Sequence, residues 1–280
     1  MRAASSSAVF VSAVLTLVVG SARAEDSTPT YVCPPEMALL SSAHPSCIDR
    51  WEASLVERRR DGSEVPFSPY RTPRGHDVRA VSLPDVVPQG HINMALAARA
   101  CRAAKKRLCH PNEWIAACVG SSRTRYPYGD RRIPGVCIDS GRTAPLAKFY
   151  SGDEMYENRN MNDARLNQVD NTVEKTGVAL QCVNELGVYD LVGNVNEWVD
   201  DQTMRGGFYL DDVELGEGCG YATKVHSAVY NDYSTGFRCC VDAHEETLTS
   251  LSPLVAIPIA EVAAWLSSIV TASSAGPGAI

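Results

Sequence analysis

The residues GVYDLVGNVNEW, from Gly187 to Trp198, carry the most specific pattern in this chain of 280 residues. They place two carboxylates, Asp190 and Glu197, seven residues apart, with a Gly193-Asn194 pair between them that permits a tight turn. Such a loop can wrap a calcium ion, which binds both carboxylates and backbone carbonyls. The spacing alone favours a plainer interpretation, in which the two acids are surface residues that flank a buried Trp198.

The chain on the N-terminal side of this motif predicts two helices. The first has Asn93 as its N-cap and basic residues near its C-terminus, which suits the helix dipole. Its buried face contains Met94, Ala97, Ala98 and Cys101. The second helix begins at Pro111 and ends at Gly120, with Trp114 and Cys118 four residues apart on its buried side.

The remaining segments of the domain predict little regular structure. The alternation around Cys47–Glu52 suggests a strand. Residues 56–90 are rich in Pro, Gly, Arg and Asp, which predicts loops with short strands. Residues 121–185 are dominated by Gly, Pro, Asn, Asp and Arg. Loops this long need tethering by a metal ion, disulfides or a ligand.

The two ends of the chain differ in character from the domain. Arg2, the apolar stretch Ala8–Val19 and the small-x-small sequence Ala22-Arg23-Ala24 predict a signal peptide over residues 1–24. Since the apolar run is too short to cross a bilayer, no membrane span is expected in the mature chain. The domain is predicted over residues 25–240. A tail over 241–280 follows, with a short amphipathic helix around Ile259–Val270 and a disordered end.

Cysteine content and charge narrow the possible classes of function. Ten cysteines in an exported chain predict disulfides, and no pair has the close spacing of a zinc site. The net charge of −7 argues against a nucleic-acid partner, which would call for a basic face. The one basic cluster, Arg58–Arg60, is typical of a solvated surface. The chain is expected to act in the periplasm, at the cell surface or as a secreted protein.

Four segments in order resemble the sulfatase-modifying-factor family, also known as the formylglycine-generating enzyme family. They are CRAAKKRLCHPNEWIAAC (101–118), YPYGD (126–130), GVYDLVGNVNEW (187–198), and RGG (205–207) with GFRC (236–239). The resemblance covers most of residues 48–240. It implies an α+β, C-type-lectin-like fold that is loop-rich and stabilised by calcium and disulfides.

The resemblance also implies ligands for a structural calcium ion. Asp190 and Glu197 match family positions that bind calcium by side chain, and Gly193 and Val195 match positions that bind it by carbonyl oxygen. The second calcium site of the family does not transfer to this sequence and is left unassigned.

Disulfide pairings follow in part from the resemblance. The family pattern implies Cys101–Cys239 and Cys118–Cys219. The remaining pairs, expected from proximity in such a fold, are Cys33–Cys47, Cys137–Cys182 and Cys109–Cys240.

The catalytic cysteine pair of the formylglycine-generating enzymes has no counterpart here. Those enzymes bind copper through two cysteines placed shortly after the Arg-Gly-Gly segment, because thiolates suit Cu(I). In this chain Asp211 stands at the first position and Gly216 near the second. Copper is therefore not expected, and Cys219 is better explained as a disulfide partner.

Two hypotheses about function remain open. In the first, the chain is an exported, non-catalytic, calcium-stabilised module that binds a protein or a glycan. In the second, it is an oxidoreductase with altered metal chemistry, acting on a peptide or a small molecule, with iron as a possible metal. The candidate catalytic residues are Asp211, Asp212, Glu214 and His226. Hydrolase and phosphate-loop motifs are absent from the sequence.

Overall fold

A three-stranded antiparallel sheet forms the most regular part of the computed structural model, which describes residues 29–246. Strand β4 (Ala53–Arg58) lies between β5 (Glu64–Pro66) and β6 (Val78–Ser82). Residues along β6 alternate between buried and half-buried, which gives the sheet one face for a helix. The sequence predicts these segments only as short strands within loops. Their long-range pairing, which local composition does not encode, joins them into a sheet.

Helix α1 (Met94–Ala103) packs against β6. Asn93 caps it as expected, since its side-chain oxygen accepts a hydrogen bond of 2.9 Å from a backbone N–H in the first turn. The fully buried positions of the helix are Ala97, Ala100 and Cys101. Met94 and Ala98, which the sequence places on the same face, are only half-buried.

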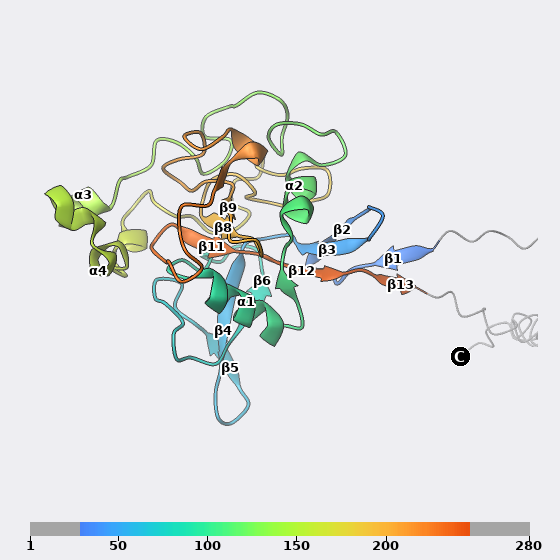
Figure 1. Ribbon diagram of the computed structural model, residues 1–280, viewed down its shortest axis with the longest axis horizontal. Coiled ribbons are helices and arrows are strands. Elements are labelled where there is room, and N and C mark those ends of the chain that lie inside the picture. The colour runs from blue at the N-terminus through green and yellow to red at the C-terminus, as the bar shows by residue number, and fades with distance from the viewer. Residues whose placement is uncertain (1–28, 247–280) are drawn as a thin grey trace, which may run out of the picture.

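A second sheet has the order β2-β3-β12-β7 and supports helix α2. Its strands are β2 (Met37–Leu40), β3 (Ser46–Asp49), β12 (Cys239–Asp242) and β7 (Arg107–Leu108). Helix α2 (Pro111–Val119) lies over β2 and β3 (Figure 1), with Trp114 and Cys118 buried as the sequence predicts. Strand β2 stands at the edge of this sheet.

The third sheet, in the order β10-β9-β8-β11, contains the motif at 187–198. Strand β8 (Asn196–Trp198) pairs in parallel with β11 (Thr235–Phe237) and antiparallel with β9 (Met204–Arg205). Strand β10 (Ala222–Thr223) pairs with β9. The motif at 187–198 therefore ends in strand β8, and the closing Gly-Phe-Arg segment contributes to the neighbouring strand β11.

The fourth sheet joins the two ends of the described chain. Strand β1 (Thr30–Val32) pairs with β13 (His244–Glu246), and both project from the same side of the domain (Figure 1). Regular structure thus continues six residues beyond the expected domain boundary at 240. The predicted signal peptide and the predicted tail helix lie outside the described residues.

The long irregular region carries only short helical turns. Those between α2 and β8 are α3 (Leu146–Phe149), η1 (Gly152–Tyr156), α4 (Asn158–Met161) and η2 (Leu166–Gln168). A further turn, η3 (Gly218–Gly220), precedes β10. Figure 1 shows α3 and α4 far from the β1–β13 pair, at the opposite end of the molecule. The arrangement is α+β and loop-rich, as the sequence predicts.

Five disulfides link these elements, and they join the same five pairs that the sequence analysis expects. The bonds are Cys33–Cys47, Cys101–Cys239, Cys109–Cys240, Cys118–Cys219 and Cys137–Cys182. One apolar core surrounds Trp114, and another surrounds Trp198 between α1 and the three-stranded sheet. Within residues 29–246, no helix has the length and apolar character needed to cross a membrane.

Candidate functional site

The turn at 190–197 encloses a buried carboxylate that belongs to another part of the chain. Asn194 donates a side-chain hydrogen bond of 2.7 Å to Glu52, and the backbone N–H of Val195 donates another of 3.2 Å. Gly193 has a φ of 80°, and a β-carbon there would collide with the carbonyl of Ile138. The glycine therefore permits both the turn and its close approach to the neighbouring loop.

Glu197 forms a buried ion pair with Arg238. The guanidinium donates hydrogen bonds of 2.6 and 2.7 Å to the two carboxylate oxygens, and the indole N–H of Trp114 donates a third of 2.7 Å. Arg238 is fully buried, and its remaining N–H groups donate to backbone carbonyls, including that of Tyr189 at 2.9 Å. This ion pair connects α2, β8 and the segment after β11 in the interior of the domain.

Asp190 lies close to these groups with one oxygen unsatisfied. Its Oδ2 accepts a hydrogen bond of 2.6 Å from the backbone N–H of Gly177, and its buried Oδ1 has no hydrogen-bond partner. Burial raises the pKa of Asp190 to about 7. Burial also raises the pKa of Glu52 well above its usual value, and the charges of Asp190 and Glu197 raise it further.

These observations bear on the expected calcium site. Three buried carboxyl groups, those of Glu52, Asp190 and Glu197, lie near one guanidinium, which is paired with Glu197, so the cluster would carry a surplus of negative charge if all three were ionised. A hard cation beside the free oxygen of Asp190 would offset that surplus. Glu197 would have to share its carboxylate between the cation and Arg238. Asp190 thus has the free oxygen that a calcium ion would need, whereas both oxygens of Glu197 already accept hydrogen bonds.

The segment after the Arg-Gly-Gly turn uses its acids to stabilise the local structure. Asp211 accepts backbone hydrogen bonds of 2.9 Å from Val213 and from Glu214, and one of 2.9 Å from the hydroxyl of Tyr221. Asp212 is buried and accepts a hydrogen bond of 2.8 Å from Arg132. Both side chains therefore have full structural roles at the positions where the family enzymes carry the first thiolate and its neighbour.

Of the other two candidate catalytic residues, Glu214 stands beside this pair, with its backbone N–H bonded to Asp211. Glu214 is exposed, and His226 stacks on Tyr230 with 3.7 Å between the ring centroids. Over the described part of the chain, no three His, Cys, Asp or Glu side chains are grouped so that they could hold a metal ion. Asp211, Asp212, Glu214 and His226 thus do not form a shared centre.

The cysteines provide no free thiol. All ten lie within residues 29–246, and each is part of a disulfide. Cys219, the cysteine nearest to the expected copper position, is bonded to Cys118 of α2.

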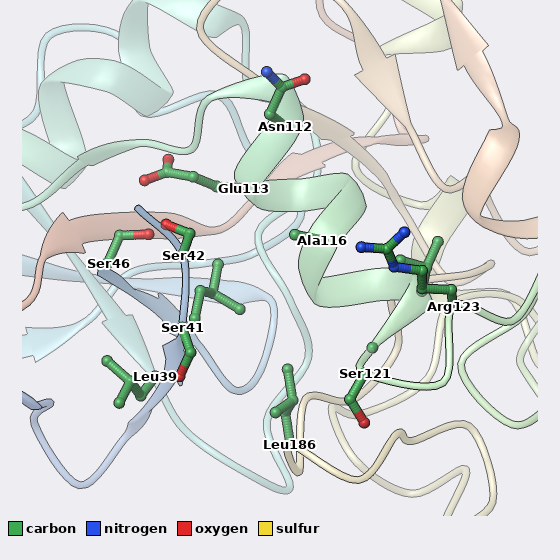
Figure 2. A pocket seen from close by; sticks show the side chains of 13 residues that line it. Leu39, Ser41, Ser42, Ser46, Asn112, Glu113, Ala116, Ser121, Arg123 and Leu186 are labelled. Carbon is green, nitrogen blue, oxygen red and sulfur yellow. The ribbon is translucent and has the colours of Figure 1, made fainter. Parts of the chain in front are cut away.

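A groove of about 570 Å³ lies between α2 and the turn that joins β2 to β3 (Figure 2). Its apolar lining consists of Leu39, Leu40, Ala116, Val119 and Leu186. Asn112 and Glu113 stand at the start of the helix in Figure 2, and Ser121 and Arg123 at its end. Glu113 is already paired with Arg107 at 2.7 Å, so Arg123 supplies the available charge.

Sequence reasoning missed several of the residues that define these sites. Glu52 stands in a segment that predicts only a strand, and no local pattern indicates that its carboxylate is enclosed by the turn at 190–197. The Asp212–Arg132 pair spans 80 residues of sequence. Arg238 does stand in the Gly-Phe-Arg segment of the family resemblance, which is the one available signal for its importance.

The comparison with protein-family models agrees with the resemblance. The family model described as "Sulfatase-modifying factor enzyme 1-like domain" matches residues 46–243. Among solved structures, PvdO from Pseudomonas aeruginosa is similar, with a TM-score of 0.44 and 15% sequence identity, over 72% of this chain and 82% of that chain. No curated protein matches.

Proposed function

We propose, from the premise that this chain belongs to the family of sulfatase-modifying factor enzyme 1-like domains, that it is an exported, non-catalytic module that binds a protein ligand. The chain has the α+β, C-type-lectin-like fold of that family. The observation that carries the proposal is the pairing of all ten cysteines. Five disulfides also accord with a chain that folds outside the reducing cytoplasm.

The absence of catalysis is supported by what replaces the thiolates of the family enzymes. Asp211 caps a turn, and Asp212 is paired with Arg132. An acid already bonded in this way is poorly placed to bind a redox metal or to transfer a proton. The segment thus resembles an active-site loop whose residues now serve stability.

The groove beside α2 supports a peptide as the ligand. Strand β2 stands at a sheet edge, where an extended peptide can form backbone hydrogen bonds as an added strand. Leu39 and Leu186 would then contact its aliphatic side chains. Aromatic side chains, on which sugar rings stack, do not line the groove. These features favour a protein over a glycan.

Binding in the groove is tested with an array of extended peptides rich in aliphatic residues. The substitution Ala116→Arg places a long charged side chain in the groove from an exposed helix position. Ala95→Arg, at an exposed position of α1, is the matched control. We expect the control to retain peptide binding and Ala116→Arg to lose it. Equal binding by both variants, or binding of glycans alone, would disprove the proposal.

The non-catalytic assignment is tested by counting thiols. We expect the purified, exported protein to show no free thiol after denaturation, to retain no copper, and to take up no oxygen with a cysteine-containing peptide. Stoichiometric copper or iron together with substrate-dependent oxygen uptake would instead support an oxidoreductase with altered metal chemistry. N-terminal sequencing of the same sample tests the expected cleavage before Glu25.

We include a structural calcium ion in the proposal. Asp190 and Glu197 would hold it by side chain, and Gly193 and Val195 by carbonyl oxygen. A bound ion would link the turn at 190–197 to the interior and offset its surplus negative charge. We expect chelation to lower the melting temperature and calcium, but not magnesium, to restore it. Asp190→Asn should abolish this response, and Asp170→Asn, at an exposed position, should retain it.

A further inference from the structure

A second, shallow cleft, widely open to solvent and of about 800 Å³, lies at the C-terminal end of α2. It is bounded by that end of the helix, by residues 123–130, by β9 and by η3. Three arginines line it, Arg123, Arg125 and Arg205. Arg123 also lines the groove of Figure 2, so the two cavities adjoin at this side chain.

The three arginines differ in how their charges are satisfied. Arg125 forms an ion pair of 2.8 Å with Glu217. Arg205 has no side-chain hydrogen bond or ion pair within residues 29–246, and its Nε is buried without a partner. The side chain of Arg123 is likewise unpaired within that part of the chain. The cleft therefore presents two guanidinium groups whose donors are unused.

The position of Arg205 is fixed by its surroundings. Its guanidinium lies 6.0 Å from the ring centroid of Trp114, whose indole N–H is bonded to Glu197. Gly206 follows with a φ of 82°, and a β-carbon there would lie 2.7 Å from the carbonyl oxygen of Leu191. The side chain thus stands on a rigid support at the wall of the cleft, and partial burial lowers its pKa.

The end of α2 presents little competing negative charge. Three of its last four carbonyls accept hydrogen bonds within the domain. These are the carbonyls of Ala116, Ala117 and Val119, which accept from Gly120, Asn184 and Thr124. An anion in the cleft would therefore meet guanidinium donors rather than bare carbonyl oxygens.

We propose that Arg205 and Arg123 form an anion-binding site for a carboxylate of the peptide that occupies the adjoining groove. The inference rests on the proposed function and specifies its ligand, an aliphatic peptide with an acidic residue. Guanidinium groups bind carboxylates through paired, charge-assisted hydrogen bonds. Asp130 and Glu217 line the same cleft, and the chain carries a net charge of −7. A single carboxylate is compatible with these acids, and a polysulfated glycan would be repelled by them.

The site is tested by observing the Arg205 Nε–H resonance in protein labelled with ¹⁵N-arginine. Sodium acetate should shift this resonance in a saturable way. Two capped peptides, acetyl-Leu-Leu-Glu-amide and acetyl-Leu-Leu-Gln-amide, then distinguish the contribution of the carboxylate to binding from that of the groove. We expect the Glu peptide to bind roughly tenfold more tightly at low salt, as for one charge-assisted contact, and the preference to shrink as salt is added.

Variants assign the effect to named residues. Arg123→Gln and Arg205→Gln should each remove the preference for the Glu peptide. Arg125→Gln, which changes an arginine already paired with Glu217, should keep it. Because Arg205 packs on Trp114, Arg205→Lys and a near-ultraviolet circular dichroism spectrum show whether the fold is intact. Arg123 is exposed in the turn after α2, so its variant does not depend on that check.

The outcomes separate this inference from the proposed function. Equal binding of the two peptides, or an Arg205 resonance that does not respond to acetate, would overturn the anion site and leave the groove in place. A response to acetate without binding of either peptide would support the anion site and contradict the peptide groove. Preferential binding of a sulfated disaccharide over the Glu peptide would overturn the assignment to a peptide carboxylate.

Discussion

Two halves of this domain reach stability by different means. We call residues 53–103, with β4 to β6 and α1, the sheet half, and residues 120–186 the loop half. The sheet half satisfies its backbone through strand ladders and one capped helix, and it buries one apolar face. The loop half satisfies backbone carbonyls with asparagine side chains. Asn160 donates to Glu154 at 2.8 Å, and Asn171 donates to Gly141 at 2.8 Å.

The difference shows why the second half depends on its covalent bonds. Backbone hydrogen bonds between the strands of a sheet form cooperatively. A hydrogen bond from an asparagine side chain to the backbone, in contrast, holds only one loop in place. Cys137–Cys182 closes most of the loop half into a single ring, and Cys118–Cys219 attaches its start to η3. Both cavities described above lie at its border with α2. The disulfides thus hold in place the loops that border both cavities.

The largest effect is expected at the buried ion pair of Arg238 with Glu197, which belongs to neither half. Arg238→Met leaves Glu197 buried beside Glu52 and Asp190 without its cation. We expect a loss of about 3–5 kcal/mol in the free energy of unfolding, because the carboxylate of Glu197 would remain buried without its positively charged partner. Denaturant titration measures it, with Arg125→Met, which breaks a surface pair, as the control. A loss no larger than that of the control would show that the buried pair contributes no more to stability than a surface pair.

A smaller loss is expected when the ring of the loop half is opened. Replacing Cys137 and Cys182 together by Ala should cost about 2–4 kcal/mol, because the bridge restricts the unfolded chain. Hydrogen exchange should then rise across 137–182 while β4 to β6 keep their protection. If exchange rises equally in both halves, they unfold as one unit and the comparison fails.

The contact between the halves should respond to pH through His91. This residue is fully buried, with both ring nitrogens unpartnered, and its backbone N–H donates to Asp232 at 2.9 Å. Burial lowers its pKa to about 4, and the side chain of Asn162 and the carboxylate of Asp163 only partly oppose the shift.

Between about pH 6.5 and 4 the unfolded chain therefore binds a proton that the folded chain does not. As the pH is lowered through that window, the free energy of unfolding should decrease, by at most about 1.4 kcal/mol per pH unit from this group. His91→Asn, which suits the residue's φ of 53°, should flatten the slope. An unchanged slope would assign the acid sensitivity to other groups.

The smallest effect is expected from a local change in the sheet half. Asn93→Ala removes the cap of α1 and should cost about 1 kcal/mol, with faster hydrogen exchange confined to the first turn of the helix. Asn93→Asp should restore most of the loss. Faster exchange in the loop half as well would mean that the two halves are more tightly coupled than their hydrogen bonds indicate.

The same contrast governs what could be predicted from the sequence. Both main helices, with the cap at Asn93 and the start at Pro111, follow from local patterns that the structure retains. The family resemblance supplied the fold class. The enclosure of Glu52 by Asn194, and the groove beside α2, depend on residues far apart in sequence. Local periodicity contains no information about such contacts, so they could not be foreseen.

The three consecutive residues Arg238, Cys239 and Cys240 have a consequence for how the chain is made. Neighbouring side chains of a strand point to opposite faces, so Cys239 joins the core around Trp198 and Cys240 the core around Trp114. Cys239 bonds Cys101, which the ribosome delivers 138 residues earlier. We expect a chain released after Phe237 to lack native near-ultraviolet circular dichroism. We therefore expect both cores to close only after these last strands have been synthesised.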